Sequence, residues 1–194
     1  MTFALAVVGL SLSIAGAGPS ADQEVSPEAV VTTVDPVHVA AHVHLLTPVA
    51  RQLVHDGLLG SPTFRALVRE LGDTDIVVIV ETGRWEPEEG RCHANLRFIG
   101  GGLDARFVRV WVDAWWRTRR EQIALLAHEL RHAVEIGVEP DARNATAVTA
   151  LYRRIGHETS DRGFETLAAP KTESAVRAEL GSSKPPTPTR ATGR

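Results

Sequence analysis

Hydrophobic and polar positions in the first half of the chain recur with a helical period. Two helical stretches each begin with a capping residue followed by proline, Thr47-Pro48 and Ser61-Pro62, and this pairing is typical of a helix N-terminus. The second stretch, Pro62–Leu71, carries apolar residues three and four positions apart and should close at Gly72. The first is predicted to run to about His55 and to stop at Gly57.

The middle of the chain changes to a strand pattern. Asp75–Glu81 (DIVVIVE) is short and rich in β-branched residues, which predicts a buried strand. Ala105–Ala114 alternates apolar and polar positions, and Asn95–Ile99 precedes it across a run of three glycines. We therefore expect a hairpin from Asn95 to Val112 beside strand 75–81, forming a small, mostly antiparallel sheet.

Helical patterns return after this sheet. Gln122–Val138 is apolar around most of its circumference, Asp141 is placed to cap a helix that runs to Ile155, and a last helix is expected at about Glu173–Leu180. Val37–Leu46 is also interpreted as helical, and its histidines are expected to be structural: His38, His42 and His44. Segregated helices and strands predict an α+β fold in which a small sheet packs on helices.

Five residues within the helix Gln122–Val138 form an HExxH motif. His128 and His132 lie four residues apart, so both side chains can reach one ion from the same helix face. Glu129 is rotated by roughly 100° from His128, close enough to act on a water without being one of the first two ligands. Zinc-dependent hydrolysis needs two neutral imidazoles, a third protein ligand, an open position and a nearby base.

The segment LLAHELRHAVE resembles the active-site helix of the zincin metallopeptidases. The resemblance implies that His128 and His132 bind Zn²⁺ and that Glu129 is the general base. It departs from the usual pattern at Arg131, since both variable positions of the motif are usually uncharged in zincins. It also implies that an edge strand of the sheet holds a peptide substrate by main-chain pairing, with Phe107–Val112 near the cleft.

A wider resemblance covers roughly residues 45–180. Over this range the chain is similar to poorly characterised bacterial exported proteins with a zincin-like motif. The resemblance rests on four segments: Ser61–Val80, Phe107–Val112, His128–Glu135 and Tyr152–Thr166.

Three glutamates are candidates for the third metal ligand. The gluzincin branch takes it from a glutamate downstream of the motif, and Glu158 and Glu165 lie at suitable distances along the chain. We favour Glu165 because it adjoins apolar Phe164, whereas Glu158 lies in a polar loop. Glu135, three residues after the second histidine, shares the ligand face but suits a role in orienting a histidine. Val138 occupies the position of the third histidine in the metzincin motif HExxHxxGxxH, which excludes that branch.

An oxyanion stabiliser is also needed for peptide hydrolysis. Tyr152 and His157 are both candidates, and the sequence does not choose between them.

Composition changes this interpretation little. The net charge of −3 gives no support for binding nucleic acid or an anionic membrane. Cys92 is the single cysteine, which excludes a disulfide within the chain.

The two ends of the chain differ from its middle. Residues 1–18 are nearly all apolar or small and end in Ala15-Gly16-Ala17, a pattern typical of a secretory signal peptide, although a positively charged start is missing. Residues 19–35 are a polar linker, 36–180 the zincin-like domain, and 181–194 a disordered tail. We expect an exported protein, periplasmic or extracellular, without a stable membrane span after cleavage of the signal.

Together these patterns predict a zinc metallopeptidase that acts on a peptide or protein substrate. The metal ligands would be His128, His132 and Glu165, and the base Glu129. The alternative is a non-catalytic exported domain that binds a metal or a partner and retains a zincin-like helix. A third interpretation is a helical module in which the motif has no function.

Overall fold

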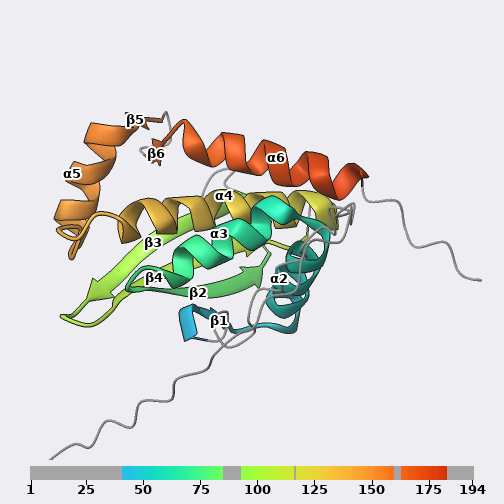
Figure 1. The fold of residues 1–194 in the computed structure, drawn as a ribbon, viewed down its shortest axis with the longest axis horizontal. Coiled ribbons are helices and arrows are strands. Elements are labelled where there is room, and N and C mark those ends of the chain that lie inside the picture. The colour runs from blue at the N-terminus through green and yellow to red at the C-terminus, as the bar shows by residue number, and fades with distance from the viewer. Residues whose placement is uncertain (1–40, 85–92, 116, 160–162, 183–194) are drawn as a thin grey trace, which may run out of the picture. The chain divides into compact units, whose positions relative to one another are not determined.

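A four-stranded sheet in the order β1–β2–β4–β3 forms one layer of the fold (Figure 1). The computed structural model describes residues 41–84, 93–115, 117–159 and 163–182, all within the unit Thr33–Arg194. The predicted signal peptide, the linker, Cys92 and residues 183–194 of the predicted tail lie outside the described residues.

The sheet is mixed, so the prediction that it is mostly antiparallel was wrong. β1 (Val43–Leu45) pairs with β2 (Ile76–Gly83) in parallel, and β2 pairs with β4 (Arg106–Asp113) in parallel as well. Only β3 (Ala94–Gly101) and β4 form the predicted antiparallel hairpin. The strand β4 lies between β2 and β3, and this long-range arrangement cannot be read from the alternation of residues along each strand.

Helices cover one face of the sheet. Its alternate residues, among them Val78 of β2 and Val110 of β4, are fully buried beneath α2, α3 and α4. The helix α6 lies along the outer side of α4, and α5 continues past the C-terminal end of α4 (Figure 1). The bounds of these helices are α2 Pro48–Gly60, α3 Pro62–Gly72, α4 Arg119–Gly137, α5 Ala145–Ile155 and α6 Ala168–Ser182. The α+β fold class is confirmed.

Both predicted N-caps of the first two helices are present. The Thr47 hydroxyl accepts from the Ala50 amide at 3.0 Å, and the Ser61 hydroxyl accepts from the Phe64 amide at 3.0 Å. The predicted stop at Gly57 was wrong, because α2 continues to Gly60. A Cβ at Gly57 would lie 3.0 Å from the Phe64 ring, so this glycine allows close packing against α3 instead of ending a helix.

Other boundaries also differ from the prediction. Residues 43–45 of the segment expected to be helical form β1, because pairing with β2 satisfies their backbone there. The helix α5 is capped by Asn144, whose side chain accepts from the Ala147 amide at 2.9 Å, and Asp141 precedes it in a turn. The helix α6 begins at Ala168 and continues to Ser182, beyond the predicted start of the tail.

The histidines expected to be structural differ in their surroundings. Nδ1 of His42 lies 2.9 Å from the carbonyl oxygen of Ile76, which ties the chain before β1 to the start of β2. His44 is exposed, and His38 lies outside the described residues. The ring of His42 thus takes part in a hydrogen bond to the main chain.

The helix α4 is anchored at both ends. Thr118 and Glu121 form a reciprocal capping box at its start, three residues before the predicted beginning of the helix. At its end, the buried guanidinium of Arg106 donates to the carbonyls of Ile136 and Gly137, each at 2.8 Å. These contacts hold the helix that carries the HExxH motif against β4.

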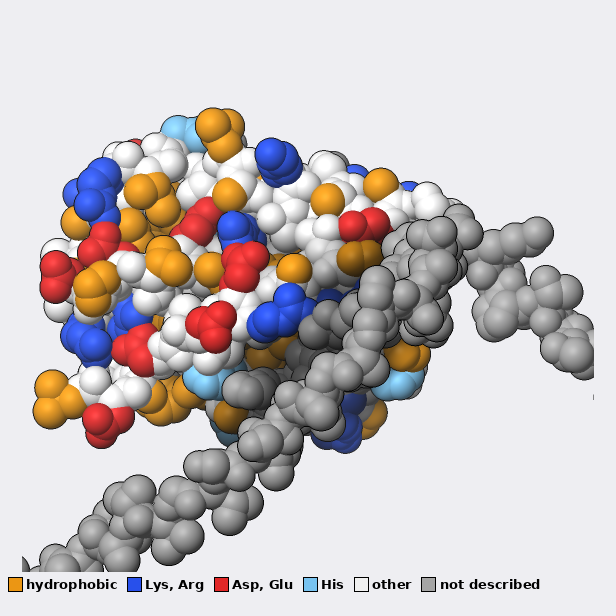
Figure 2. Space-filling model, in the orientation of Figure 1, with side chains coloured by type: hydrophobic (Ala, Val, Ile, Leu, Met, Phe, Trp, Pro, Cys, Tyr) orange, Lys and Arg blue, Asp and Glu red, His pale blue; other side chains and the backbone are white. Residues whose placement is uncertain are grey.

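The surface of the described residues is mixed in charge. On the face seen in Figure 2, basic and acidic side chains lie interspersed. No helix in the described part of the chain combines the length and the apolar character needed to cross a membrane.

Candidate metal centre

The two histidines of the motif lie one turn apart on α4. Their ring centroids are 5.0 Å apart and the ring planes meet at 73°. The helix is buried on most sides, as its apolar pattern predicted, and His132 is only 6% exposed. Arg131, the unusual charge in the motif, forms an ion pair with Glu70 of α3. Its charge is therefore accommodated at the contact with a neighbouring helix.

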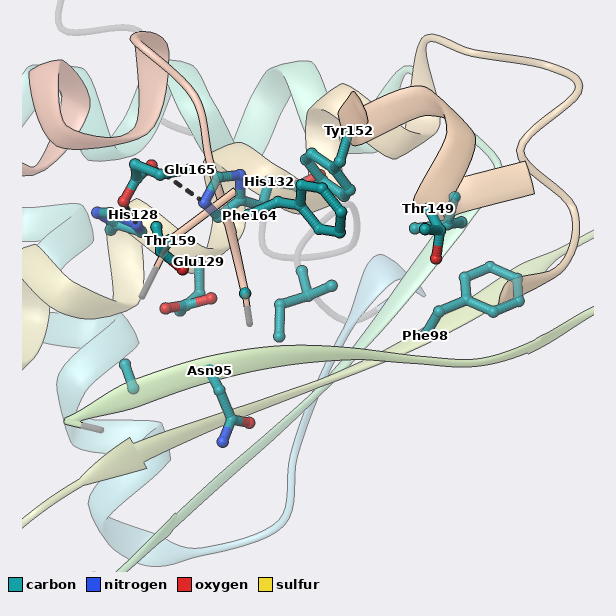
Figure 3. A pocket seen from close by; sticks show the side chains of 14 residues that line it. Asn95, Phe98, His128, Glu129, His132, Thr149, Tyr152, Thr159, Phe164 and Glu165 are labelled. Carbon is teal, nitrogen blue, oxygen red and sulfur yellow. Dashed lines mark hydrogen bonds and ion pairs between the residues drawn. The ribbon is translucent and has the colours of Figure 1, made fainter. Parts of the chain in front are cut away.

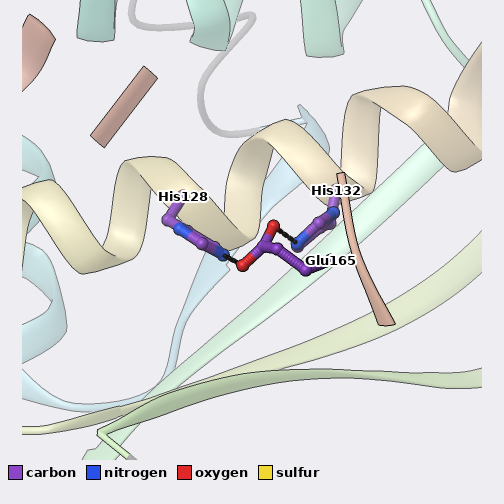
Figure 4. Close-up of side chains that lie close together, drawn as sticks. All are labelled: His128, His132 and Glu165. Carbon is purple, nitrogen blue, oxygen red and sulfur yellow. Dashed lines mark ion pairs between the residues drawn. The ribbon is translucent and has the colours of Figure 1, made fainter. Parts of the chain in front are cut away.

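Glu165 extends between the two imidazoles from a different part of the chain (Figure 4). One of its carboxylate oxygens lies 3.2 Å from Nε2 of His128, and the other lies 3.5 Å from Nε2 of His132. One ligand atom from each residue can be chosen so that all three lie within 4.8 Å of one another. The structure thus brings together the three residues that the sequence favoured as metal ligands.

A short ribbon of two strands positions Glu165. β5 (His157–Glu158) pairs with β6 (Phe164–Glu165) in antiparallel register, so Glu158 is opposite Phe164 and is exposed. Gly156 ends α5 directly before this ribbon, and a Cβ there would lie 2.5 Å from the carbonyl oxygen of Glu165. A side chain at position 156 would therefore displace the strand that carries the carboxylate.

Each imidazole is also held from its other nitrogen by a second carboxylate. Nδ1 of His128 lies 3.0 Å from Glu173 of α6, and Nδ1 of His132 lies 2.9 Å from Glu135 of α4. An Nδ1–H that donates to a carboxylate leaves the Nε2 lone pair free and fixes the orientation of the ring. Glu135 therefore occupies the orienting position that the sequence suggested for it.

Thr166 connects Glu135, which orients His132, to Glu165, which lies between the two histidines. Its hydroxyl lies 2.7 Å from Glu135, and its amide donates to the Glu165 carboxylate at 2.8 Å. The same hydroxyl accepts from the Ala169 amide at 3.4 Å in the first turn of α6. One buried threonine therefore links α4, β6 and α6.

The charges of this cluster favour a cation. Burial alone would lower the pKa of His132, but hydrogen bonds to Glu135 and Glu165 outweigh burial and raise the pKa to about 9. Burial also opposes the charged form of His128, yet the hydrogen bond to Glu173 raises its pKa. A field that stabilises positive charge on two buried rings would also stabilise a divalent cation between them.

Glu129 lies beside the two histidines and is not part of their contacts with Glu165. It is 7% exposed, and burial raises its pKa to about 7 against the opposing charges of His132 and His128. Its carboxylate borders a cavity of about 360 Å³ that also reaches His128, His132 and Glu165 (Figure 3). A reactant in this cavity would therefore meet the base and the three ligand candidates together.

The strand that lines the cavity is β3, contrary to the expectation for Phe107–Val112. β4, which contains Phe107–Val112, is interior to the sheet, whereas β3 is an edge strand. Leu96 and Phe98 of β3 form part of the cavity wall. The order of the strands in the sheet decides which hairpin strand lies at the edge. The sequence could not show this, because both hairpin strands carry similar alternating patterns.

The two candidate oxyanion donors have different positions. The hydroxyl of Tyr152 is buried and donates to the main-chain carbonyl of His132 at 3.0 Å. Burial raises its pKa further, which keeps it protonated. His157 is exposed on β5. The Tyr152 hydroxyl is therefore committed to joining α5 to α4.

Several residues of the site were missed in the sequence. Glu173 was placed at the start of a helix without a link to His128, since 45 residues separate them. The part of the cavity wall that β3 forms was missed for the same reason, because β3 is far from the motif along the chain. The capping box, by contrast, has a local signal, Thr118-Arg-Arg-Glu121, that was available from the sequence.

The donor set fits zinc. Ligand atoms of a tetrahedral zinc site lie roughly 2.0–2.2 Å from the metal, which places them roughly 3.3 Å from one another. The two contacts between imidazole nitrogens and Glu165 oxygens, 3.2 and 3.5 Å, have this spacing. Two imidazoles and one carboxylate, each imidazole oriented by a further carboxylate, are a common ligand set for a catalytic zinc.

Comparison with known proteins adds no further assignment. No protein-family model matches the chain, and no curated protein or solved structure is significantly similar to it.

Proposed function

We propose that this chain is a zinc-dependent hydrolase of peptide bonds, with His128, His132 and Glu165 as metal ligands and Glu129 as general base. The observation that carries the proposal is the contact of both Nε2 atoms with Glu165 while each Nδ1 contacts a different carboxylate. Pairs of histidines on helices are common, but this double layer of carboxylates around them matches the needs of a metal site. The adjoining cavity provides room for a substrate.

The residues of the chain have separate tasks in this reaction. A zinc ion held by the three ligands would supply a water of lowered pKa and a Lewis acid for the carbonyl of the substrate. Glu129 accepts a proton from the attacking water as the new C–O bond forms, and it donates that proton to the amine as the C–N bond breaks. Glu135 and Glu173 keep both rings in the orientation that exposes Nε2.

The edge strand β3 supports a peptide as the substrate. It borders the cavity, and an edge strand has backbone groups available for pairing with an extended chain. We also infer export, as the apolar N-terminal run Thr2–Gly18 suggests; that segment lies outside the described residues.

Metal content is the first test. Purified full-length protein should bind about one zinc per chain by elemental analysis, as one catalytic site requires, and His132→Ala should lose it. Zinc should also raise the melting temperature of the wild type but not of the variant, because a ligand that binds only the folded state stabilises it. A wild-type chain that binds no zinc after reconstitution would contradict the proposal.

Catalysis is the second test. Glu129→Gln should retain zinc and lose roughly 10²–10⁴-fold in the rate of hydrolysis of a peptide library, as expected for removal of a general base. Zinc binding without hydrolysis by the wild type would instead favour the alternative, a non-catalytic metal-binding domain.

A further inference from the structure

The cavity beside the motif has two ends of different chemistry. One end is polar and contains Glu129 and the His–Glu cluster. The other extends toward α5, where Phe98, Val148, Tyr152 and Phe164 contribute to its wall (Figure 3). The rings of Tyr152 and Phe164 are stacked, with centroids 6.2 Å apart and an angle of 17° between the planes.

The side-chain hydroxyls at this second end already have partners within the protein. The Tyr152 hydroxyl donates to the His132 carbonyl at 3.0 Å, and the Thr149 hydroxyl donates to the Ala145 carbonyl at 2.9 Å. What these two side chains offer to a ligand is mainly their carbon surface. A large apolar side chain therefore gains from leaving water here, whereas a charged side chain would lose hydration without a matching partner.

Every second residue of β3 forms backbone hydrogen bonds with β4, and the residues between them direct their backbone groups away from β4. The Asp113 amide donates to the His93 carbonyl at 2.8 Å, which makes this opposed pair a hydrogen-bonded one. Because hydrogen-bonded and non-hydrogen-bonded pairs alternate in an antiparallel ladder, the backbone groups of Leu96 and Phe98 point away from β4. Both residues also line the cavity, so an extended peptide could pair with them while its side chains enter it.

The direction of β3 relates the two ends of the cavity to the two ends of such a peptide. The strand runs from Asn95, near Glu129, toward Phe98, near Thr149 of α5 (Figure 3). Antiparallel strand pairs outnumber parallel ones roughly two- to three-fold, and a peptide paired antiparallel to β3 would place its N-terminal part at the apolar end and its C-terminal part beyond Glu129. Among the described residues that line the cavity there is no Lys or Arg to bind a terminal carboxylate.

We propose that the cavity selects a large apolar side chain of an internal peptide segment, on the N-terminal side of the cleaved bond. The protein would thus act as an endopeptidase with an apolar subsite formed by Phe98, Val148, Tyr152 and Phe164. This inference rests on the proposed function, and it adds the substrate class and the direction of binding.

The experiment uses zinc-loaded full-length protein and one peptide library in two forms, with free termini and with N-acetyl and C-amide blocking groups. Mass spectrometry of the products should show Leu, Phe or Met enriched on the N-terminal side of the cleavage sites. Phe98→Ala should reduce the preference for Leu over Ala at that position, measured as the ratio of kcat/KM values, by about tenfold. Ile99→Ala is the matched control, because Ile99 is the next residue of β3, is 49% exposed and lies at the bulge.

Several outcomes would overturn the inference. These are cleavage without side-chain preference, enrichment on the C-terminal side only, or a requirement for a free terminus. An equal effect of Phe98→Ala and Ile99→Ala would also contradict it.

Peptide binding separates this inference from the proposed function. The Glu129→Gln protein, loaded with zinc, should bind a fluorescent Leu-containing peptide about tenfold more tightly than its Ala counterpart, as measured by anisotropy. If the wild type cleaves no peptide, the proposed function fails and with it the assignment to one side of the cleaved bond. Equal binding of the two peptides overturns the apolar subsite itself, whether or not cleavage occurs.

Discussion

The guanidinium of Arg106 lies against the carboxylate of Asp75, with Nε 2.8 Å from Oδ1. Arg106 is 1% exposed, and its other nitrogens donate to carbonyl oxygens at the C-terminal end of α4 and in the turn that follows. The last carbonyls of a helix lack the usual donor four residues further on, so the arginine adds donors from β4 to the C-terminal end of α4. A buried arginine, paired with a partly buried aspartate, therefore holds the helix with the HExxH motif in place on the sheet.

Replacing this arginine should be strongly destabilising. Arg106→Met removes the nearest partner of the Asp75 carboxylate, which keeps only Arg143 at 3.3 Å, and removes the side-chain donor to several carbonyls. The free energy of unfolding should therefore fall by about 3–5 kcal/mol. Urea denaturation followed by circular dichroism measures this change. Arg109→Met on the same strand is the control, because Arg109 is half exposed and pairs with Glu81 at 3.8 Å; it should cost less than about 1 kcal/mol. Similar losses in both variants would contradict the anchoring role.

The same pair should make stability depend on pH in the acid range. Burial would raise the pKa of Asp75, but the hydrogen bond and charge of Arg106 outweigh burial and lower it. The stabilisation is then complete above the unfolded-state pKa of about 3.8 and is lost as pH falls through the lower folded-state pKa. The difference in unfolding free energy between wild type and Asp75→Asn should therefore shrink below about pH 4. Asp104→Asn, in an exposed loop, is the control, and a difference that stays constant from pH 7 to pH 3 would refute this account.

The carboxylates behind the histidines should tune metal affinity. Glu173→Gln removes the charge that orients His128 and should weaken zinc binding by about 10–100-fold, as measured by competition with a chromophoric chelator. Glu179→Gln is the control on the same helix, because Glu179 contacts Ser61 and Thr63 at the start of α3. That variant should lose stability and keep its zinc affinity. Equal affinities for the wild type and Glu173→Gln would show that Glu173 does not support the site.

The backbone next to Glu165 should be sensitive to a single methyl group. Gly156→Ala would place a Cβ 2.5 Å from the Glu165 carbonyl oxygen, so the backbone of β6 must shift relative to the end of α5. We expect zinc affinity to fall at least about tenfold while the fold persists. Gly102→Ala is the control, because the nearest atom to its added Cβ is 3.9 Å away. Unchanged affinity in Gly156→Ala would mean that Glu165 does not need this position of the strand.

Tyr152 distinguishes a packing role from a catalytic one. Its hydroxyl donates to the His132 carbonyl, so Tyr152→Phe should cost about 1 kcal/mol of unfolding free energy. The rate of peptide hydrolysis should fall less than about tenfold, whereas loss of an oxyanion donor typically costs about 10²–10³-fold. A rate loss in the larger range would assign the hydroxyl to the reaction.

Local signals in the sequence predicted a helix or strand well where the capping or turn residues agree with the hydrophobic periodicity. The caps Thr47 and Ser61, the hairpin through the glycines and the buried helix around His128 were all predicted, because each depends on neighbours along the chain. Gly57 shows the limit of such signals, since a glycine that ends a helix and one that lets a ring pack closely look alike in sequence.

The sequence by itself determined that two histidines four residues apart share one face of a buried helix with a glutamate beside them, since helical geometry relates neighbours without further information. Only the tertiary structure decided that Glu165 lies between them while Glu158 is exposed, that Glu173 supports His128, and that β3 borders the cavity. These relationships join segments tens of residues apart. They depend on strand order and helix packing, which are set by the collective burial of the core and leave no local periodicity to read.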